Sequence, residues 1–257
     1  MSGRTAGGDA VGDAVGALPR ALRAPITPGR VLVWAIAAGV PLAFLAVFFA
    51  VPVAGLVVRG FVTDGAVDLT GFGEVMSRPR TWRLIGITLA QATVGTTAAL
   101  LLGLPGAHLL YRTSFRGRGL LRAVVAVPFV LPTVVVGVAF RSVLSGSGPL
   151  AFLGWDGTFA GVVLALVFFN YTVVVRTLGA FWAGLDPRAE QAARALGASP
   201  ARAFVSVTLP ALGPGLASAA SIVFLFCATA FGVVLVLGGV GYGTVETEIW
   251  VQTTQFL

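Results

Sequence analysis

The sequence predicts an all-α fold, a polytopic bundle of about five membrane-spanning helices. Hydrophobic residues make up 57% of the 257 positions and charged residues only 11%, whereas soluble domains carry about 25% charge. Mean hydropathy is +0.94. A helix needs roughly 20 apolar residues to span a bilayer, and uncharged apolar runs of about that length occupy Val31–Val58, Leu84–Leu110, Ala123–Phe140, Thr158–Val175 and Leu216–Leu237.

The amino-terminal part of the chain differs from the rest. Residues 1–30 are rich in Gly and Ala and show no sustained apolar period, which predicts a disordered cytoplasmic tail. Residues 31–80 are expected to form the first transmembrane helix and an outer loop. Prolines inside the apolar runs are tolerated in lipid when neighbouring helices satisfy the freed carbonyls, so a packed bundle is expected around Pro41, Pro52, Pro105 and Pro132.

Charge placement predicts the orientation in a cytoplasmic membrane. The basic residues are all arginine, and they gather before the first apolar run, after the second and after the fourth. By the positive-inside rule these three segments and the N-terminus are cytoplasmic. Because the arginines only separate apolar runs, without the basic face and interleaved aromatics of a nucleic-acid binder, no nucleic-acid partner is expected.

A short polar unit at residues 186–210 interrupts the apolar chain. Helix start signals occur twice, first at Asp186 and Pro187 and again at Ser199 and Pro200. Gly197 can close the first helix, and Pro210 forces the second to end or kink near Leu209. The pattern predicts two short helices joined at a glycine.

This unit, "EQAARALGASPARAFVSVTLP", resembles the EAA loop of permease subunits of binding-protein-dependent ABC importers. On that pattern Gly197 is the glycine and Val207 takes the isoleucine position. Gln191 stands where the pattern has glutamate, with Glu190 one position earlier. The resemblance implies that the ATPase-coupling residues are Glu190, Gln191, Ala192, Ala193, Arg194, Gly197, Val207, Leu209 and Pro210.

The resemblance covers residues 81–257 and implies a type I ABC importer transmembrane module. "TLAQATVGTTAALLLGLPGAHLLYR" and "VPFVLPTVVVGVAF" resemble its first core helices. "FGVVLVLGGVGYGTVETEIW" is similar to ferric-iron and thiamine importer permeases. The family core has one more helix after that segment, which suggests a chain truncated before a sixth helix or the first half of a two-module permease.

Several partners are implied by the resemblance. The EAA loop of this family forms a coupling helix that docks on separate ABC ATPase subunits, which bind ATP and Mg²⁺. An extracytoplasmic substrate-binding protein delivers the substrate. A second permease module and membrane lipids are the other implied partners. The residues themselves argue against ATP hydrolysis by this chain: a P-loop needs a lysine, and the sequence has none. We therefore expect neither an enzyme nor a bound cofactor.

Few polar side chains interrupt the apolar runs. Gln91 and Asn170 are candidates for the substrate path, because polar groups at membrane depth often face a wet pathway; hydrogen bonds between helices are the alternative role. Arg176 is explained equally well by snorkelling to the interface. His108 is expected at the interface, and no metal site is expected from its spacing to other ligand residues.

The similarity near the C-terminus favours ferric iron or thiamine as the substrate. An importer of an inorganic anion or a polyamine is the alternative within the same family. Two other classes stay open: an ion-coupled secondary transporter, which would be expected to carry ionisable residues near the bilayer midplane, and a membrane scaffold without transport activity.

Overall fold

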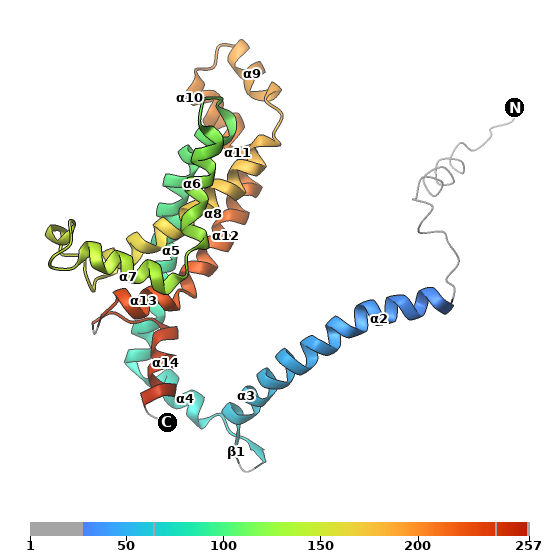
Figure 1. The fold of residues 1–257 in the computed structure, drawn as a ribbon, viewed down its shortest axis with the longest axis vertical. Coiled ribbons are helices and arrows are strands. Elements are labelled where there is room, and N and C mark those ends of the chain that lie inside the picture. Colours follow the sequence, from blue (N-terminus) through green and yellow to red (C-terminus); the bar gives the residue numbers. More distant parts are fainter. Residues whose placement is uncertain (1–27, 64, 240, 256–257) are drawn as a thin grey trace, which may run out of the picture. The chain divides into compact units, whose positions relative to one another are not determined.

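The computed structural model describes residues 28–63, 65–239 and 241–255, and it is built almost entirely of helices (Figure 1). The chain divides into two compact units, Met1–Gly73 and Glu74–Leu257. The expected tail at residues 1–30 lies almost wholly outside the described residues. The only strands among the described residues, β1 (Val62–Thr63) and β2 (Ala66–Val67), form a small antiparallel hairpin.

The first unit contains one long apolar helix. It consists of α2 (Pro28–Leu45), a π-helical turn η2 (Ala46–Ala50) and α3 (Val51–Phe61). The π turn ends two residues before Pro52, so the missing N–H of this proline falls close to the point where the hydrogen-bond pattern already changes. Residues 31–61 have a mean hydropathy of 2.5 and no buried side chain in the described structure. A helix that is apolar on all sides suits lipid.

The second unit begins within α4 (Thr70–Ser77) and contains the bundle. Its helices are α5 (Pro79–Arg112), α6 (Arg118–Val130), α7 (Thr133–Leu144), the 3₁₀ turn η3 (Ala151–Leu153), α8 (Phe159–Ala183), α9 (Arg188–Ala195), α10 (Pro200–Ala203), the π turn η4 (Phe204–Thr208), α11 (Leu209–Ala211), α12 (Gly213–Ala228), α13 (Phe231–Leu237) and α14 (Val245–Gln255). Helices α5, α8 and α12 pack along one another, with α9 and α10 at one end of this unit and α14 at the other (Figure 1).

Close packing of α5 on α8 depends on small residues. The buried face of α5 repeats Ala92, Thr96, Ala99, Gly103 and Ala107 at helical spacing. A Cβ atom at Gly103 would lie 2.5 Å from Cγ1 of Val174 on α8. Small residues at this spacing let two backbones approach in a membrane, where van der Waals contact replaces the hydrophobic effect as the driving force. The pair α5–α8 is therefore a rigid centre for the unit.

The structure corrects two of the five predicted spans. The run Ala123–Phe140 is broken at Leu131, and α6 and α7 meet at 100°. Leu131 precedes Pro132 and is extended (φ −72°, ψ 136°), because a residue before proline avoids the helical region. The run Leu216–Leu237 is broken too: Phe231 N–H donates to the Thr229 carbonyl in a tight turn between α12 and α13.

The two half-helices created by these breaks pack against each other. A Cβ atom at Gly137 of α7 would lie 3.0 Å from Cβ of Val236 on α13, and one at Gly232 of α13 would lie 2.5 Å from Oγ1 of Thr133. Three described helices are long and apolar enough to cross a membrane. Up to five spans result if two bent pairs each form one span, Arg118–Val130 with Thr133–Leu144 and Pro200–Ala211 with Gly213–Ala228. The all-α membrane bundle is thus confirmed, with two of its elements bent.

Candidate functional site

Residues 186–210 form the predicted pair of short helices with a glycine between them. Asp186 Oδ1 accepts a hydrogen bond from Arg188 N at 2.9 Å and so satisfies the first free N–H group of α9. At the other end of α9, Gly197 adopts a left-handed φ of 91°. Its N–H donates to the Arg194 carbonyl, while Ala198 N–H donates to the Ala193 carbonyl. These two bonds define a Schellman motif, which satisfies the last carbonyls of the helix.

The second short helix continues further than expected. Ser199 caps α10 by accepting a hydrogen bond from Arg202 N, and Pro200 occupies its first turn. The chain then passes through the π turn η4 into α11. Pro210 stands in the first turn of α11, a position where a missing N–H costs little. The 65° bend consequently comes after Ala211 rather than at Leu209.

One hydrogen bond closes the unit onto itself. Thr208 Oγ1 donates to Glu190 Oε2 at 2.8 Å, and Thr208 is only 5% exposed. The acidic side chain in the first turn of α9 therefore fixes the far end of the second helix. The neighbouring Gln191, which occupies the glutamate position of the EAA pattern, is exposed.

The outer surface of this unit is available to a partner. Ala192 and Arg194 are exposed, and Ala193 and Val207 are half-buried. Leu196, at the end of α9, is 90% exposed. Leu196 and Thr208 were not predicted from the sequence. A large apolar residue directly before a helix-ending glycine was the signal that could have indicated Leu196.

Behind the unit lies a cavity of about 660 Å³ that reaches the ends of α5 and α8. It is lined by His108, Arg112, Trp182, Glu190, Arg194, Phe204, Leu104, Pro105 and Pro200. The Trp182 ring lies 5.1 Å from His108 and 5.8 Å from Phe204, measured between ring centroids. Trp182 on α8 thus connects η4 with α5 through aromatic contacts.

Gln91 and Asn170, the predicted path residues, both lie in the packed interior and are 0% exposed. Gln91 Nε2 donates to the Cys227 carbonyl in the last turn of α12, and Tyr242 Oη donates to Gln91 Oε1 at 2.6 Å. Asn170 Nδ2 donates to the Leu166 carbonyl within α8 and to Cys227 Sγ of α12 at 3.4 Å. In this conformation the two side chains join elements of the bundle, and their role in a substrate path stays a prediction.

This buried cluster explains how the broken helix is held. The Cys227 carbonyl belongs to the turn before the break between α12 and α13, where intrahelical partners run out. Gln91 of α5 supplies the missing donor. The Tyr242 hydroxyl, which is protonated at neutral pH, donates to the amide oxygen of the same Gln91 side chain. Tyr242 was missed because it stands in a run of glycines that by itself predicts only a bend.

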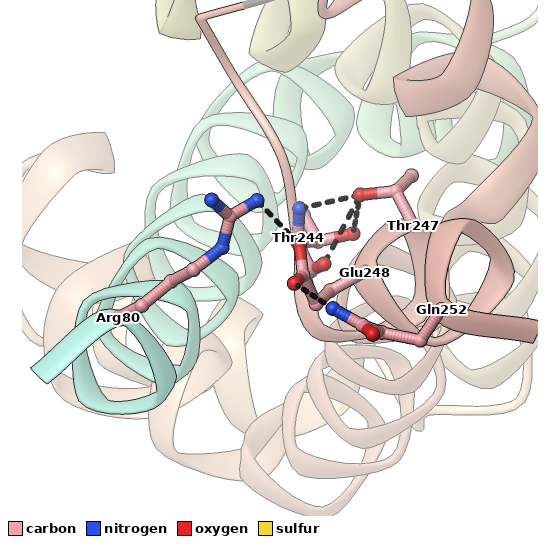
Figure 2. Close-up of polar contacts among 5 residues, drawn as sticks. All are labelled: Arg80, Thr244, Thr247, Glu248 and Gln252. Atoms are coloured by element: carbon pink, nitrogen blue, oxygen red, sulfur yellow. Dashed lines mark hydrogen bonds and ion pairs between the residues drawn. The ribbon is translucent and has the colours of Figure 1, made fainter. Parts of the chain in front are cut away.

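At the opposite end of the second unit, α14 is fastened to α5. Figure 2 shows Arg80 of α5 directed at Glu248 of α14, with Nη2 and Oε2 2.7 Å apart, and Gln252 on the other carboxylate oxygen. Thr247 Oγ1 accepts from Thr244 N at the start of α14, which satisfies one of its free N–H groups. The Arg80 guanidinium lowers the pKa of Glu248.

Comparison with known proteins agrees with this arrangement. The family described as "Binding-protein-dependent transport system inner membrane component" matches residues 95–256. The molybdenum transport permease ModB of Azotobacter vinelandii is 37% identical over 60% of this chain and 72% of its own length. The sulfate transport permease CysT of Escherichia coli is 30% identical over 83% of this chain and 78% of its own.

Solved structures show the same fold. A bacterial ABC transporter that imports the polysaccharide alginate has a chain that superposes with a TM-score of 0.71 at 16% identity, covering 87% of this chain and 85% of that one. The relatives do not support ferric iron or thiamine as the substrate. The chain belongs to the family of inner membrane components of binding-protein-dependent transport systems, and it is a permease subunit of an ABC importer with the type I transmembrane fold.

Proposed function

We propose that the chain is the permease subunit of an ATP-driven importer of a tetrahedral inorganic oxyanion, of the kind represented by molybdate and sulfate. Relatives named for molybdenum and for sulfate transport support this substrate class, because their alignments with this chain cover 72% and 78% of the relatives' lengths. The five apolar runs carry no acidic residue, which suits the passage of a dianion. Among the residues that the structure describes, no group of three or more metal-ligating side chains could hold a metal ion.

Coupling to a separate ATPase through residues 186–210 is the second part of the proposal. The exposed Leu196 and the small side chains of α9 offer a compact apolar contact. Behind them, Phe204, Trp182 and His108 form a continuous aromatic connection to α8 and α5. A displacement of the unit by an ATPase dimer would therefore reach the rigid α5–α8 pair, and rigid-body motion could switch the accessible side of the bundle.

The remaining partners follow from this assignment. The ATPase subunits would bind ATP and Mg²⁺ and carry the hydrolysis, so this chain would be neither an enzyme nor a cofactor protein. A binding protein would deliver the oxyanion from outside, and a second permease module would complete the path. An alginate ABC transporter has been solved in complex with its ligand-bound periplasmic protein. The N-terminus would be cytoplasmic.

Uptake by the assembled transporter in lipid vesicles tests the proposal. We expect ATP-dependent accumulation of radioactive molybdate or sulfate that requires both the ATPase and the binding protein. Accumulation driven by an ion gradient without ATP would instead establish a secondary transporter. No accumulation of any oxyanion in an assembled, ATP-hydrolysing transporter would refute the substrate class.

A further inference from the structure

We propose that a cavity around Arg176 of α8 is a binding site for the transported oxyanion; this inference rests on the proposed function. The cavity has a volume of about 460 Å³ and lies between α6, α8 and the end of α5. Its lining is Tyr111, Phe129, Thr172, Val173, Arg176, Thr177 and Ala180, without an acidic residue.

Arg176 is placed unlike an ordinary residue of a packed helix. It is exposed, whereas its neighbours Val174, Val175 and Leu178 are at most 1% exposed. At 1.5 Å per residue it lies about 10 Å before the end of α8, inside a helix long and apolar enough to cross a membrane. A charged side chain at such depth normally faces a partner or a water-filled pathway.

Two other arginines at this end of the bundle, Arg118 and Arg122, have structural partners. Arg122 donates through Nε to the Leu110 carbonyl at 2.9 Å and lies over the Tyr111 ring, 4.1 Å from its centroid. Arg118 donates to the Thr113 carbonyl at 2.8 Å. Both therefore stabilise the carboxyl-terminal end of α5, where cations are favourable.

Arg176, in contrast, makes no hydrogen bond or ion pair with any of the residues that the structure describes. Its guanidinium keeps five donors in a planar fork, the geometry that matches two oxygens of a tetrahedral anion. Tyr111 and Thr177, which both carry a hydroxyl group, line the same cavity. The positive charge of Arg122 against the Tyr111 ring adds to the potential there. A free guanidinium, nearby hydroxyl groups and a positive potential all favour the binding of an anion.

Uptake measurements on matched arginine variants test the site. In the assembled transporter, Arg176→Gln is expected to lower molybdate or sulfate uptake about tenfold or more, because a charge-assisted hydrogen bond is lost. Arg176→Lys should keep part of the uptake. The control is Arg116→Gln, which removes the same charge from the exposed loop between α5 and α6 and should change nothing.

A binding measurement separates the oxyanion from a lipid headgroup, which shares its phosphate-like chemistry. Ala180→Cys introduces a thiol into the cavity, and the only native cysteine, Cys227, is 0% exposed. Free oxyanion should slow maleimide labelling when Arg176 is present and have no effect in the Arg176→Gln background. Slowing by anionic lipid alone would make Arg176 a headgroup anchor and overturn the proposal.

The two proposals fail differently. A parent transporter that imports no oxyanion refutes the proposed function. A parent that imports it, while Arg176→Gln matches Arg116→Gln in uptake or Ala180→Cys labelling ignores the oxyanion, refutes only the site.

Discussion

Substitution of Gly197 tests whether the shape of the 186–210 unit matters for coupling. Its φ of 91° lies in the left-handed region, and a Cβ atom added there would meet no heavy atom within 4 Å. Any effect of alanine is therefore conformational and not a clash. An L-residue pays about 1–2 kcal/mol in this conformation, which corresponds to about a 5–30-fold loss of the loop conformer.

We expect Gly197→Asn to lower uptake least, Gly197→Ala to lower it more and Gly197→Val to lower it most. Asparagine tolerates the left-handed region, and a β-branched residue is the worst fit. The assay is ATP-dependent uptake together with co-purification of the ATPase. Gly213→Ala is the matched control. Like Gly197, Gly213 has no heavy atom within 4 Å of an added Cβ atom, but unlike Gly197 it does not adopt a left-handed φ. If Gly197→Val retains docking and uptake at the level of this control, the coupling assignment is wrong.

Three further outcomes are expected. Gln91→Leu should destabilise the detergent-solubilised protein by about 1–3 kcal/mol for each buried group left unpaired, and its effect should be non-additive with Tyr242→Phe in thermal unfolding; additivity would show that the 2.6 Å bond does not exist. Leu196→Asp should leave thermal stability unchanged, because the side chain is 90% exposed, but weaken ATPase co-purification; unchanged binding would exclude Leu196 from the interface. The lowered pKa of Glu248 adds stability above its unfolded pKa of about 4.3, which is lost as the pH falls through the folded value; Arg80→Gln should reduce this acid sensitivity below about pH 4, and an unchanged pH profile would contradict the ion pair.

Local signals were enough to predict the membrane bundle and the helix–glycine–helix unit. The Asp186–Arg188 hydrogen bond and the left-handed conformation of Gly197 depend on neighbouring residues only, so local sequence patterns can predict them. Hydropathy cannot locate a break, because Leu131 and Ala230 are as apolar as their surroundings. The proline at 132 was visible, but neighbouring helices decide whether a proline in lipid kinks a helix or ends it.

The candidate sites were predicted less completely, for a related reason. Gln91 and Asn170 were singled out as polar groups within apolar runs, and both are buried. Whether they face a path or a carbonyl depends on which distant segment packs there. The partners of Gln91 are separated from it by 136 and 151 residues. No local pattern records contacts at such distances, and the similarity to iron and thiamine permeases rested on one segment alone.

The long sequence separation of these partners also constrains biogenesis. Helix α5 enters the membrane before the side-chain amide of Gln91 has its hydrogen-bond partners. These partners, on α12 and at Tyr242, are synthesised more than a hundred residues later. At about 5–20 residues per second, the side chain waits for several seconds without its native acceptor and donor. A polar group left in lipid is costly, so α5 is expected to stay near the insertion machinery, or near another polar helix, until α12 arrives.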